Sequence, residues 1–268
     1  MSVYDIAALH AALQGTLFEG KLHHFRVVDS TNVVALEAAQ EGAASGSVYF
    51  ANEQTAGRGR GGHTWHSAAG DGMYASVLLR PSLAPAAALK ISLAAGLAAR
   101  AAIAEVSGLQ ADIRWPNDLM LDGRKCGGIL VDTAATGDAE RLRHVVIGVG
   151  INVNHEAFPD DLRYLATSLR IESGAGQSVQ ALLAALLRNL ASEMTALETG
   201  DAVLERFAAA STWVRGKRVH VESVHGKDGD GYTGITNGLD VHGFLRILTE
   251  SGAERLVLSG GVREITED

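Results

Sequence analysis

The stretch RWPNDLMLDGRKCGGIL, residues 114–130, contains the pattern that decides the fold. Its two apolar runs are separated by Asp122-Gly123, and Asp-Gly between such runs is a strong signal for a two-residue hairpin turn. Helical patterns lie on both sides of this hairpin, over residues 31–42, 85–107 and 178–199. Helices mixed with antiparallel hairpins favour an α+β fold over a doubly wound parallel sheet.

The rest of the chain contains further predicted strands, and its pattern of apolar and polar residues changes near its end. Apolar spacing predicts a helix over residues 3–18, a strand that runs into a Ser/Thr turn over 25–32, and strands over 47–54, 73–80 and 144–154. After Trp213 the sequence becomes short alternating runs between Gly, Asp and Asn turns, which is typical of a small β-barrel. We therefore predict two domains, residues 1–212 and 213–268.

Composition and charge limit the classes of function. The chain has 268 residues, 47% of them hydrophobic, and a formal net charge of −8, which disfavours non-specific nucleic-acid binding. Cys126 is the only cysteine, so no intrachain disulfide is possible. The most apolar stretch, 83–108, carries Lys90, Arg100 and Glu105, so we expect a buried helix rather than a membrane span. The start lacks the charged segment of a secretory signal, and we expect a cytoplasmic protein.

A glycine-rich cationic loop, NEQTAGRGRGGHTW over residues 52–65, is the first candidate site. Glycines let backbone N–H groups approach a ligand, and Arg58 and Arg60 supply planar donor forks suited to carboxylate or phosphate. Gly57, Gly59 and Gly62 formally match a dinucleotide-binding pattern, but no helix follows them, as that motif requires. A solvated surface loop is the alternative interpretation.

The hairpin itself supplies the second candidate site. Lys125 precedes Gly127 and Gly128, so its side chain could lie against a ligand with little steric hindrance, although taken alone an exposed hairpin lysine is favoured, because lysines are rarely buried. Asn117 and Asp118 lie where the first strand of the hairpin begins. They either contact a ligand or serve as turn residues.

Two shorter motifs complete the set. In GVGINVN, residues 148–154, Gly148 and Gly150 imply close backbone approach within a strand, and Asn152 could bind an adenine edge or terminate the strand. In DSTN, residues 29–32, Ser30 or Thr31 is a good helix cap. The ten histidines show no metal-binding spacing.

Taken in order, DSTN, EQTAGRGRGGHTW, RWPNDLML-DGRKCGGIL and GVGINVN resemble the motifs of biotin protein ligases. The resemblance implies a class II synthetase-like catalytic domain, a mixed sheet with flanking helices, followed by a small SH3-like barrel. It also implies a two-step reaction. Biotin is adenylated by ATP, with Mg²⁺ assisting, to biotinyl-5′-AMP and pyrophosphate. Biotin is then transferred to a lysine of a biotin carboxyl carrier protein, the expected partner.

The resemblance also assigns residues to roles. It implies that Arg60 and Lys125 are catalytic, and it implies no metal ligands. The implied biotin contacts are Ser30, Thr31, Asn32, Gln54, Gly57, Arg58, Gly59, Arg60, Lys125, Gly127 and Gly128. The implied ATP contacts are Arg58, Arg60, Trp65, Arg114, Asn117, Asp118, Lys125 and Asn152.

This chain departs from the family pattern at three places. Gly61 and His63 stand where the family usually has arginines, so we expect looser retention of the adenylate. Arg114 replaces the usual lysine, which exchanges a point charge for a planar fork. Fewer than 30 residues precede DSTN, so we expect a short form without an N-terminal DNA-binding domain.

Three rival functions remain open at this point. A lipoate or octanoate ligase or transferase belongs to the same superfamily, but the arginine-rich loop favours biotin. A biotin-sensing DNA-binding regulator is disfavoured by length and charge. A non-enzymatic nucleotide-binding module is disfavoured by Lys125 beside the loop. The sequence leaves the oligomeric state open between monomer and homodimer.

Overall fold

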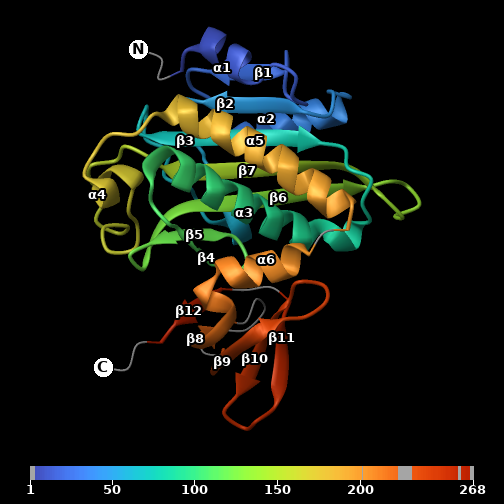
Figure 1. Cartoon of the computed structure of the whole chain (residues 1–268), viewed down its shortest axis with the longest axis vertical. Coiled ribbons are helices and arrows are strands. Elements are labelled where there is room, and N and C mark those ends of the chain that lie inside the picture. The colour runs from blue at the N-terminus through green and yellow to red at the C-terminus, as the bar shows by residue number, and fades with distance from the viewer. Residues whose placement is uncertain (1–3, 201, 223–230, 259–260, 266–268) are drawn as a thin grey trace.

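A seven-stranded mixed sheet carries the larger, N-terminal part of the molecule (Figure 1). This computed structural model describes residues 4–200, 202–222, 231–258 and 261–265. The strand order is β1-β2-β3-β7-β6-β5-β4, and among these strands only β1 and β2 pair in parallel. The strands are β1 (Leu22–Phe25), β2 (Ser47–Ala51), β3 (Gly72–Leu79), β4 (Asp112–Arg114), β5 (Asp118–Leu121), β6 (Arg124–Ala135) and β7 (Leu142–Asn152). The predicted α+β class is confirmed.

The β5–β6 hairpin forms where the Asp-Gly pair predicts it. Asp122 and Gly123 have φ angles of 46° and 70°, and Leu121 pairs with Arg124 across the turn. Positive φ at both central residues is the geometry for which Asp-Gly is selected, because it matches the twist of the flanking strands. The turn fixes the register that carries Lys125 back along β5.

Helices cover both faces of the sheet, and the alternation of strand side chains decides which face packs against which helix. The helix α2 (Thr31–Gln40) covers one face, whereas α3 (Ala88–Ser107) and α5 (Val179–Glu198) cover the other (Figure 1). On β3, Val77 joins the core under α3 and α5, and its neighbour Leu78 joins the cluster under α2. The α2 face is therefore the face on which even-numbered β3 residues lie.

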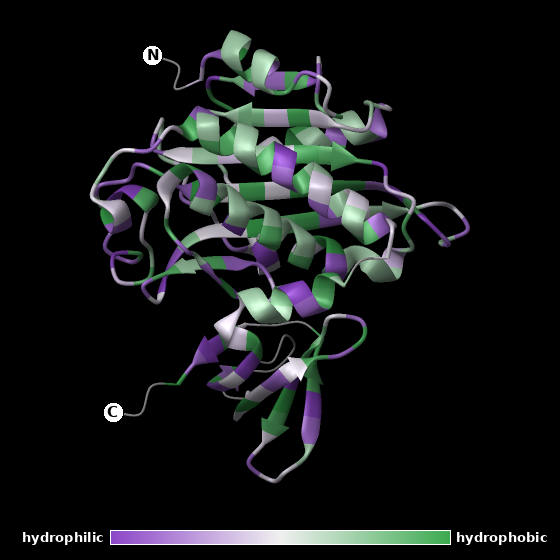
Figure 2. Ribbon diagram, viewed as in Figure 1, coloured by the Kyte–Doolittle hydropathy of each residue, from purple (hydrophilic) through white to green (hydrophobic). Residues whose placement is uncertain are grey.

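The helix α3 is the buried alanine-rich helix that the sequence predicts. Figure 2 shows mainly apolar colours along it and along the strands beneath it. Among the described residues, the span Pro85–Ser107 is long and apolar enough to cross a membrane by length and composition. Most of this segment is buried against α5 and the sheet, and Gly108 ends the helix with a φ of 73°.

The shorter helices agree less well with the sequence patterns. The helix predicted over 3–18 is wrong in extent, since α1 covers only Ile6–Ala12. Gly15, with a φ of 72°, lies in the turn that follows, and Leu17 is 44% exposed. A short helix that the sequence did not predict, α4, covers Leu169–Ser173. The sequence also predicts a helix over residues 201–210, and α6 covers Val203–Ala210 within that span.

A second, antiparallel sheet follows at the C-terminal end. Its order is β11-β10-β9-β8-β12. The strands are β8 (Arg215–Val221), β9 (Tyr232–Leu239), β10 (Leu245–Thr249), β11 (Glu254–Val257) and β12 (Val262–Glu264). The small C-terminal β unit is thus confirmed, whereas β11 and β12 do not pair within the described residues, and closure into a barrel stays a prediction. The exact boundary at 212/213 also stays a prediction.

The second sheet is attached to the strand β4 and the turn after it. The Trp115 indole N–H donates to the Gly243 carbonyl at 2.9 Å, and the Ser211 hydroxyl donates to the Ile113 carbonyl at 2.5 Å. The Thr212 backbone N–H donates to Asp112 Oδ1 at 3.0 Å. The C-terminal unit therefore supports the segment that leads into Asn117 and Asp118.

Candidate functional site

The floor of the candidate site is made of strand positions that lack side chains. On the α2 face, Gly128 of β6 lies opposite Gly150 of β7, which in turn lies opposite Tyr74 of β3. In the adjacent row, Gly148 of β7 lies opposite Ser76. Three glycines in two neighbouring rows leave a hollow in a sheet face that side chains would otherwise fill.

Two side chains from other segments occupy part of this hollow. A Cβ on Gly148 would lie 2.6 Å from Asn32 Oδ1, and a Cβ on Gly150 would lie 2.6 Å from Trp65 Nε1. The close backbone approach predicted for both glycines is confirmed. The start of α2 and the end of the cationic loop are thereby brought onto the same patch of sheet.

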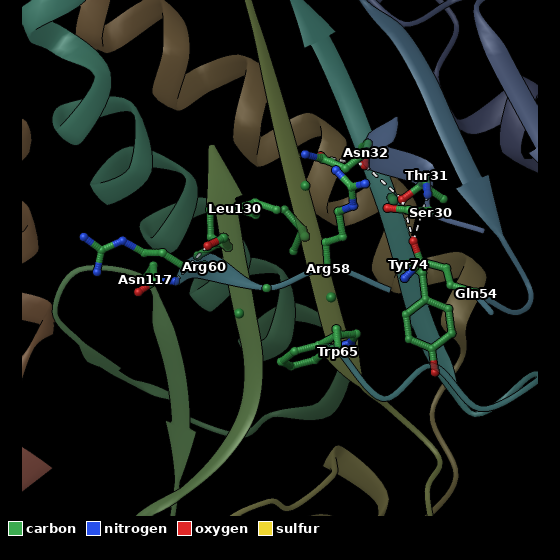
Figure 3. A pocket seen from close by; sticks show the side chains of 18 of the residues that line it. Ser30, Thr31, Asn32, Gln54, Arg58, Arg60, Trp65, Tyr74, Asn117 and Leu130 are labelled. Carbon is green, nitrogen blue, oxygen red and sulfur yellow. Dashed lines mark hydrogen bonds between the residues drawn. The ribbon is translucent and has the colours of Figure 1, made fainter. Parts of the chain in front are cut away.

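The pocket that results holds about 460 Å³ of empty space, part of it open to solvent (Figure 3). It is lined by Ser30, Thr31, Asn32, Gln54, Arg58, Gly59, Arg60, Trp65, Tyr74, Ala75, Ser76, Asn117, Lys125, Gly128, Ile129, Leu130, Gly148, Val149 and Gly150. These residues come from α2, the loop, β3, β6 and β7, together with the start of β5.

A chain of hydrogen bonds lines the side of the pocket next to α2. The Thr31 backbone N–H donates to Gln54 Oε1 at 2.8 Å, and the Thr31 and Ser76 hydroxyls lie 2.9 Å apart. The Ser76 hydroxyl donates to Asn32 Oδ1 at 3.1 Å, and Gln54 Nε2 donates to the Ser67 hydroxyl at 2.9 Å. This side of the pocket is neutral, polar and held in one arrangement.

Ser30 occupies the N-cap position of α2 but does not act as a hydrogen-bonding cap. Its side chain accepts no hydrogen bond from the described backbone of the first turn, although its backbone is extended as an N-cap should be. The residue is 1% exposed and lines the pocket. The sequence therefore predicts the N-cap position of Ser30 correctly. It does not predict that the Ser30 hydroxyl faces the pocket instead of capping the helix.

Lys125 lies in a compact charged cluster on the opposite side of the pocket. Lys125 Nζ is 2.5 Å from Asp118 Oδ1, and Arg114 Nη2 is 2.7 Å from Asp118 Oδ2. Burial alone would raise the pKa of Asp118, but Lys125 and Arg114 outweigh burial and lower that pKa below its ordinary value. The Lys125 ammonium also lies 5.4 Å from the centre of the Trp65 ring.

The cationic loop forms a small hairpin of its own. The Gly59 N–H donates to the His63 carbonyl at 2.7 Å, and the Trp65 N–H donates to the Gly57 carbonyl at 2.9 Å. Gly61, at the turn, has a φ of 69°, a conformation in which a Cβ is disfavoured. The loop is therefore bonded mainly to itself near its tip.

The two loop arginines point in different directions. In Figure 3, Arg58 points toward Asn32 and Ser30, whereas Arg60 projects toward the side of Asn117. Partial burial lowers the pKa of Arg60, and the Asp118 carboxylate opposes this effect. Arginine stays cationic in proteins, so both groups bring positive charge to the pocket. A pocket with a neutral polar side and a cationic side suits a ligand with a polar head and an anionic end.

Comparison with known proteins agrees with this geometry. Residues 24–152 match the model of the biotin/lipoate A/B protein ligase family. The biotin–[acetyl-CoA-carboxylase] ligase of Mycobacterium tuberculosis is 33% identical over 237 residues, which cover 87% of this chain and 84% of that protein. The chain belongs to the biotin protein ligases.

Other relatives extend the comparison. The bifunctional ligase/repressor BirA of Bacillus subtilis is 43% identical over 150 residues, which cover 55% of this chain and 46% of that protein. The chain thus spans about half the length of these Bacillus relatives. The solved structure of the Aquifex aeolicus biotin protein ligase in complex with biotin and ATP is 26% identical, with a TM-score of 0.76 over 92% of this chain and all of that one.

Most of the family residues inferred from the sequence meet in the one pocket. Those that line it are Ser30, Thr31, Asn32, Gln54, Arg58, Gly59, Arg60, Trp65, Asn117, Lys125 and Gly128. Asn117 also donates through Nδ2 to the Ile129 carbonyl at 2.9 Å. Arg114 and Asp118 do not line the pocket but lie one contact behind it, against Lys125. Their contact with ATP stays a prediction.

Two of the predicted glycines serve packing rather than the pocket lining. A Cβ on Gly57 would lie 2.6 Å from the Trp65 carbonyl oxygen, inside the loop hairpin. A Cβ on Gly127 would lie 2.8 Å from Leu119 Cδ1, on the core side of the sheet. Alternation along β6 puts Gly127 and Gly128 on opposite faces, so only Gly128 reaches the ligand side.

Asn152 also departs from its predicted place. Its Nδ2 group donates to the Thr167 carbonyl at 3.0 Å, and the residue is 5% exposed and does not line the pocket. The amide thus holds the segment that follows β7. The geometry gives the predicted adenine contact of Asn152 no support.

Sequence reasoning missed Ser76 and Tyr74 among the lining residues. Ser76 is fully buried and is the one small polar residue in the otherwise apolar and aromatic strand GMYASVLL, which is the signal that could have found it. Cys126, in contrast, behaves as expected, since burial raises the pKa of its thiol to about 12.

Proposed function

We propose that this chain is an ATP-dependent biotin ligase. A carboxylate oxygen of biotin attacks the α-phosphorus of ATP, which forms biotinyl-5′-AMP and releases pyrophosphate. The amine of a carrier-protein lysine then attacks the acyl carbon, loses a proton and displaces AMP. One observation carries the proposal: a single pocket joins the neutral hydrogen-bonding groups around Thr31 to the cationic groups Lys125 and Arg60.

Similarity supports the choice of biotin. The Mycobacterium tuberculosis relative is named as a biotin–[acetyl-CoA-carboxylase] ligase, and the Aquifex structure is a complex with biotin and ATP. A carrier domain of a biotin-dependent carboxylase is accordingly the partner that we propose.

Lys125 is the residue to which we assign the main electrostatic role in adenylation. Two anions, a carboxylate and a phosphate, must approach each other, and a fixed cation between them lowers the barrier more than it stabilises either reactant. The Lys125 ammonium is held by Asp118 at 2.5 Å and rests, together with the Trp65 ring, against Gly128, which has no side chain of its own. When substrate binds, the Lys125 ammonium exchanges the Asp118 carboxylate for substrate oxygens and so stays paired with an anion during the reaction.

Arg58 and Arg60 are assigned to the same anionic part of the ligand. Both line the pocket on a loop of glycines, and guanidinium groups bind carboxylate and phosphate through paired N–H donors. Closure of such a loop also excludes water, which would otherwise hydrolyse a mixed anhydride.

The part of the chain that the structure describes shows no cluster of metal-binding side chains. Among the described residues, no group of three His, Cys, Asp or Glu side chains could bind one, and the Asp118 carboxylate is already shared by two cations. Mg²⁺ in this reaction is therefore assigned to the phosphates of ATP rather than to a protein site.

The test is direct detection of the intermediate. The protein is incubated with biotin, ATP and Mg²⁺, and biotinyl-5′-AMP is sought by mass spectrometry, with lipoate in place of biotin as a control. Addition of a biotin carboxyl carrier domain is expected to consume the adenylate and raise the mass of that domain by one biotinyl group. Absence of any adenylate with biotin, or equal adenylation of lipoate, contradicts the proposal.

A further inference from the structure

Asp132 lies behind the pocket and contacts one of its residues. It is on β6, two positions beyond the pocket residue Leu130, and does not itself line the cavity. Asp132 Oδ2 is 2.5 Å from Asn32 Nδ2. A carboxylate only accepts hydrogen bonds, so Asn32 must present its NH₂ group to Asp132.

The orientation of Asn32 then determines the donor at the next contact. With Nδ2 toward Asp132, Asn32 Oδ1 faces the Ser76 hydroxyl at 3.1 Å. An amide oxygen can only accept, and a hydroxyl has a single proton. Ser76 therefore gives its proton to Asn32 and can only accept from its other neighbour, the Thr31 hydroxyl at 2.9 Å.

A second anchor fixes the other neighbour of Thr31. The Ser67 hydroxyl donates to the Trp65 carbonyl at 3.2 Å, so it accepts from Gln54 Nε2 at 2.9 Å. Gln54 is thereby oriented with Oε1 toward Thr31, at 2.8 Å from its backbone N and 3.1 Å from its hydroxyl. The amide of Gln54 offers Thr31 an acceptor and no donor.

Both interior neighbours of the Thr31 hydroxyl are therefore acceptors. Its one proton is directed into the protein, toward Ser76 or Gln54, and only oxygen lone pairs remain for a ligand in the pocket. Such a hydroxyl binds an N–H donor and leaves a purely accepting or apolar ring unsatisfied. The ureido ring of biotin carries two N–H groups, whereas a dithiolane ring carries none.

We propose that Asp132 is a positioning residue for substrate selection, which acts through Asn32 and Ser76 to hold Thr31 as a hydrogen-bond acceptor. This inference rests on the proposed function and adds to it a reason why the pocket selects a ring with N–H donors. Asp132 touches no ligand, because its contact is with Asn32 on the protein side of the relay.

Substitution of Asp132 tests the relay. In Asp132→Asn the new amide can donate to Asn32, which lets Asn32 turn over, lets Ser76 donate to Thr31, and leaves the Thr31 proton free to point at the ligand. Ser76→Ala interrupts the relay one step later. Asp132→Glu keeps the carboxylate, and Glu140→Gln removes a similar charge from the exposed β6–β7 turn as the matched control.

The measurement is biotin binding by calorimetry without ATP, using biotin and biotin alkylated on its ureido nitrogens. We expect Asp132→Asn and Ser76→Ala to bind biotin about tenfold more weakly, which corresponds to a loss of roughly 1.4 kcal/mol in binding free energy. We expect Asp132→Glu and Glu140→Gln to stay near wild type, and the wild-type preference for biotin over the alkylated form to shrink in Asp132→Asn. Unfolding temperatures establish that each variant is folded.

The outcomes separate this inference from the proposed function. Equal biotin affinity in wild type and Asp132→Asn overturns the role of Asp132 and leaves the ligase proposal standing. A loss of affinity that is the same for biotin and for the alkylated form also overturns it, because the relay predicts a change in selectivity. A wild-type protein that binds no biotin overturns both.

Discussion

At the scale of single residues, the site depends on a lysine that is paired before any substrate arrives. Lys125 and Arg114 share the two oxygens of Asp118, and side chains of all three are partly or mostly buried. An unpaired ammonium in such a place would lose solvation without compensation. The carboxylate thus holds the Lys125 ammonium in place beside the pocket.

Replacing Lys125 tests its role in charge neutralisation. We expect Lys125→Met to lower biotin-dependent pyrophosphate release at least tenfold, about 1.4 kcal/mol or more in the barrier. Biotin binding without ATP should change less, because the ureido side of the pocket is untouched. Lys90→Met, on α3 and outside the pocket, is the control. Wild-type rates of pyrophosphate release in Lys125→Met would contradict the assignment.

Asp118 leads to a prediction about how the free energy of unfolding depends on pH. Its pKa is lowered in the folded protein, so the folded state binds that proton less readily than the unfolded chain. Its stabilisation is therefore complete above the ordinary carboxyl pKa of about 3.9 and is lost as pH falls toward the lower folded value. We expect Asp118→Asn to reduce the free energy of unfolding by about 2 kcal/mol near neutral pH.

Urea denaturation across the acid range measures this difference. The gap between wild type and Asp118→Asn should narrow as the pH falls below about 3.9, because the unfolded chain then binds a proton that folded Asp118 binds only at lower pH. A gap that stays constant from neutral to acid pH would mean that the ion pairs contribute nothing to stability.

Gly150 gives a steric prediction with a close control. A Cβ there would lie 2.6 Å from Trp65 Nε1, whereas a Cβ on Gly137 in the β6–β7 turn would meet no described atom within 4 Å. We expect Gly150→Ala to displace Trp65 and lower adenylation several-fold, since overpacking typically costs about 1–3 kcal/mol. Gly137→Ala should retain wild-type activity. Equal activities in the two variants would show that adenylation does not depend on the position of the Trp65 side chain over Gly150.

At the scale of elements, local signals predicted much of the structure. The Asp122-Gly123 turn, the long helices and the glycine loop each depend on residues close in sequence, and the structure has all three. The extent of α1 was not predicted, because the periodic leucines continue past the turn at Gly15. Periodicity alone does not indicate where a helix ends.

The site was less predictable than the fold because it depends on register between distant strands. Ser76 reaches Asn32 only because β3 pairs with β7 in one particular register, and Asp132 reaches it from β6. Asn152 is bonded through Nδ2 to the neighbouring segment at Thr167, and its contact with adenine stays a prediction. Sequence spacing carries no information about such cross-strand contacts.

The loop over residues 55–66 gives a prediction for hydrogen exchange. In the absence of ligand, its internal hydrogen bonds include those donated by Gly59 and Trp65, and its glycines keep it flexible. We expect rapid exchange along most of the loop in the free protein and slow exchange with biotin and ATP together. Equal protection in the two states would contradict closure of the loop over substrate.

At the scale of the whole molecule, the C-terminal sheet contacts the same segment that carries the charged cluster. Asp112 and Ile113 bond to residues just before β8, and Trp115 bonds to the turn between β9 and β10. Arg114, between them, lies 5.4 Å from the centre of the Trp213 ring. A line of contacts thus runs from the second sheet through Arg114 and Asp118 to Lys125.

Trp213 is the place to test whether this line matters for activity. Its ring lies between Arg114 and the ammonium of Lys217, the latter at 5.5 Å, and it is 7% exposed. Trp213→Phe keeps an aromatic face for Arg114, whereas Trp213→Leu keeps apolar bulk without one. Because a cation–π contact is worth about 0.5–2 kcal/mol, we expect the leucine variant to lose roughly two- to thirtyfold in adenylation and the phenylalanine variant to lose less. Pyrophosphate release is measured for both variants, after thermal unfolding has shown that their unfolding temperatures are similar. Equal losses in the two variants would reduce Trp213 to a packing residue and would leave Arg114 dependent on Asp118 alone.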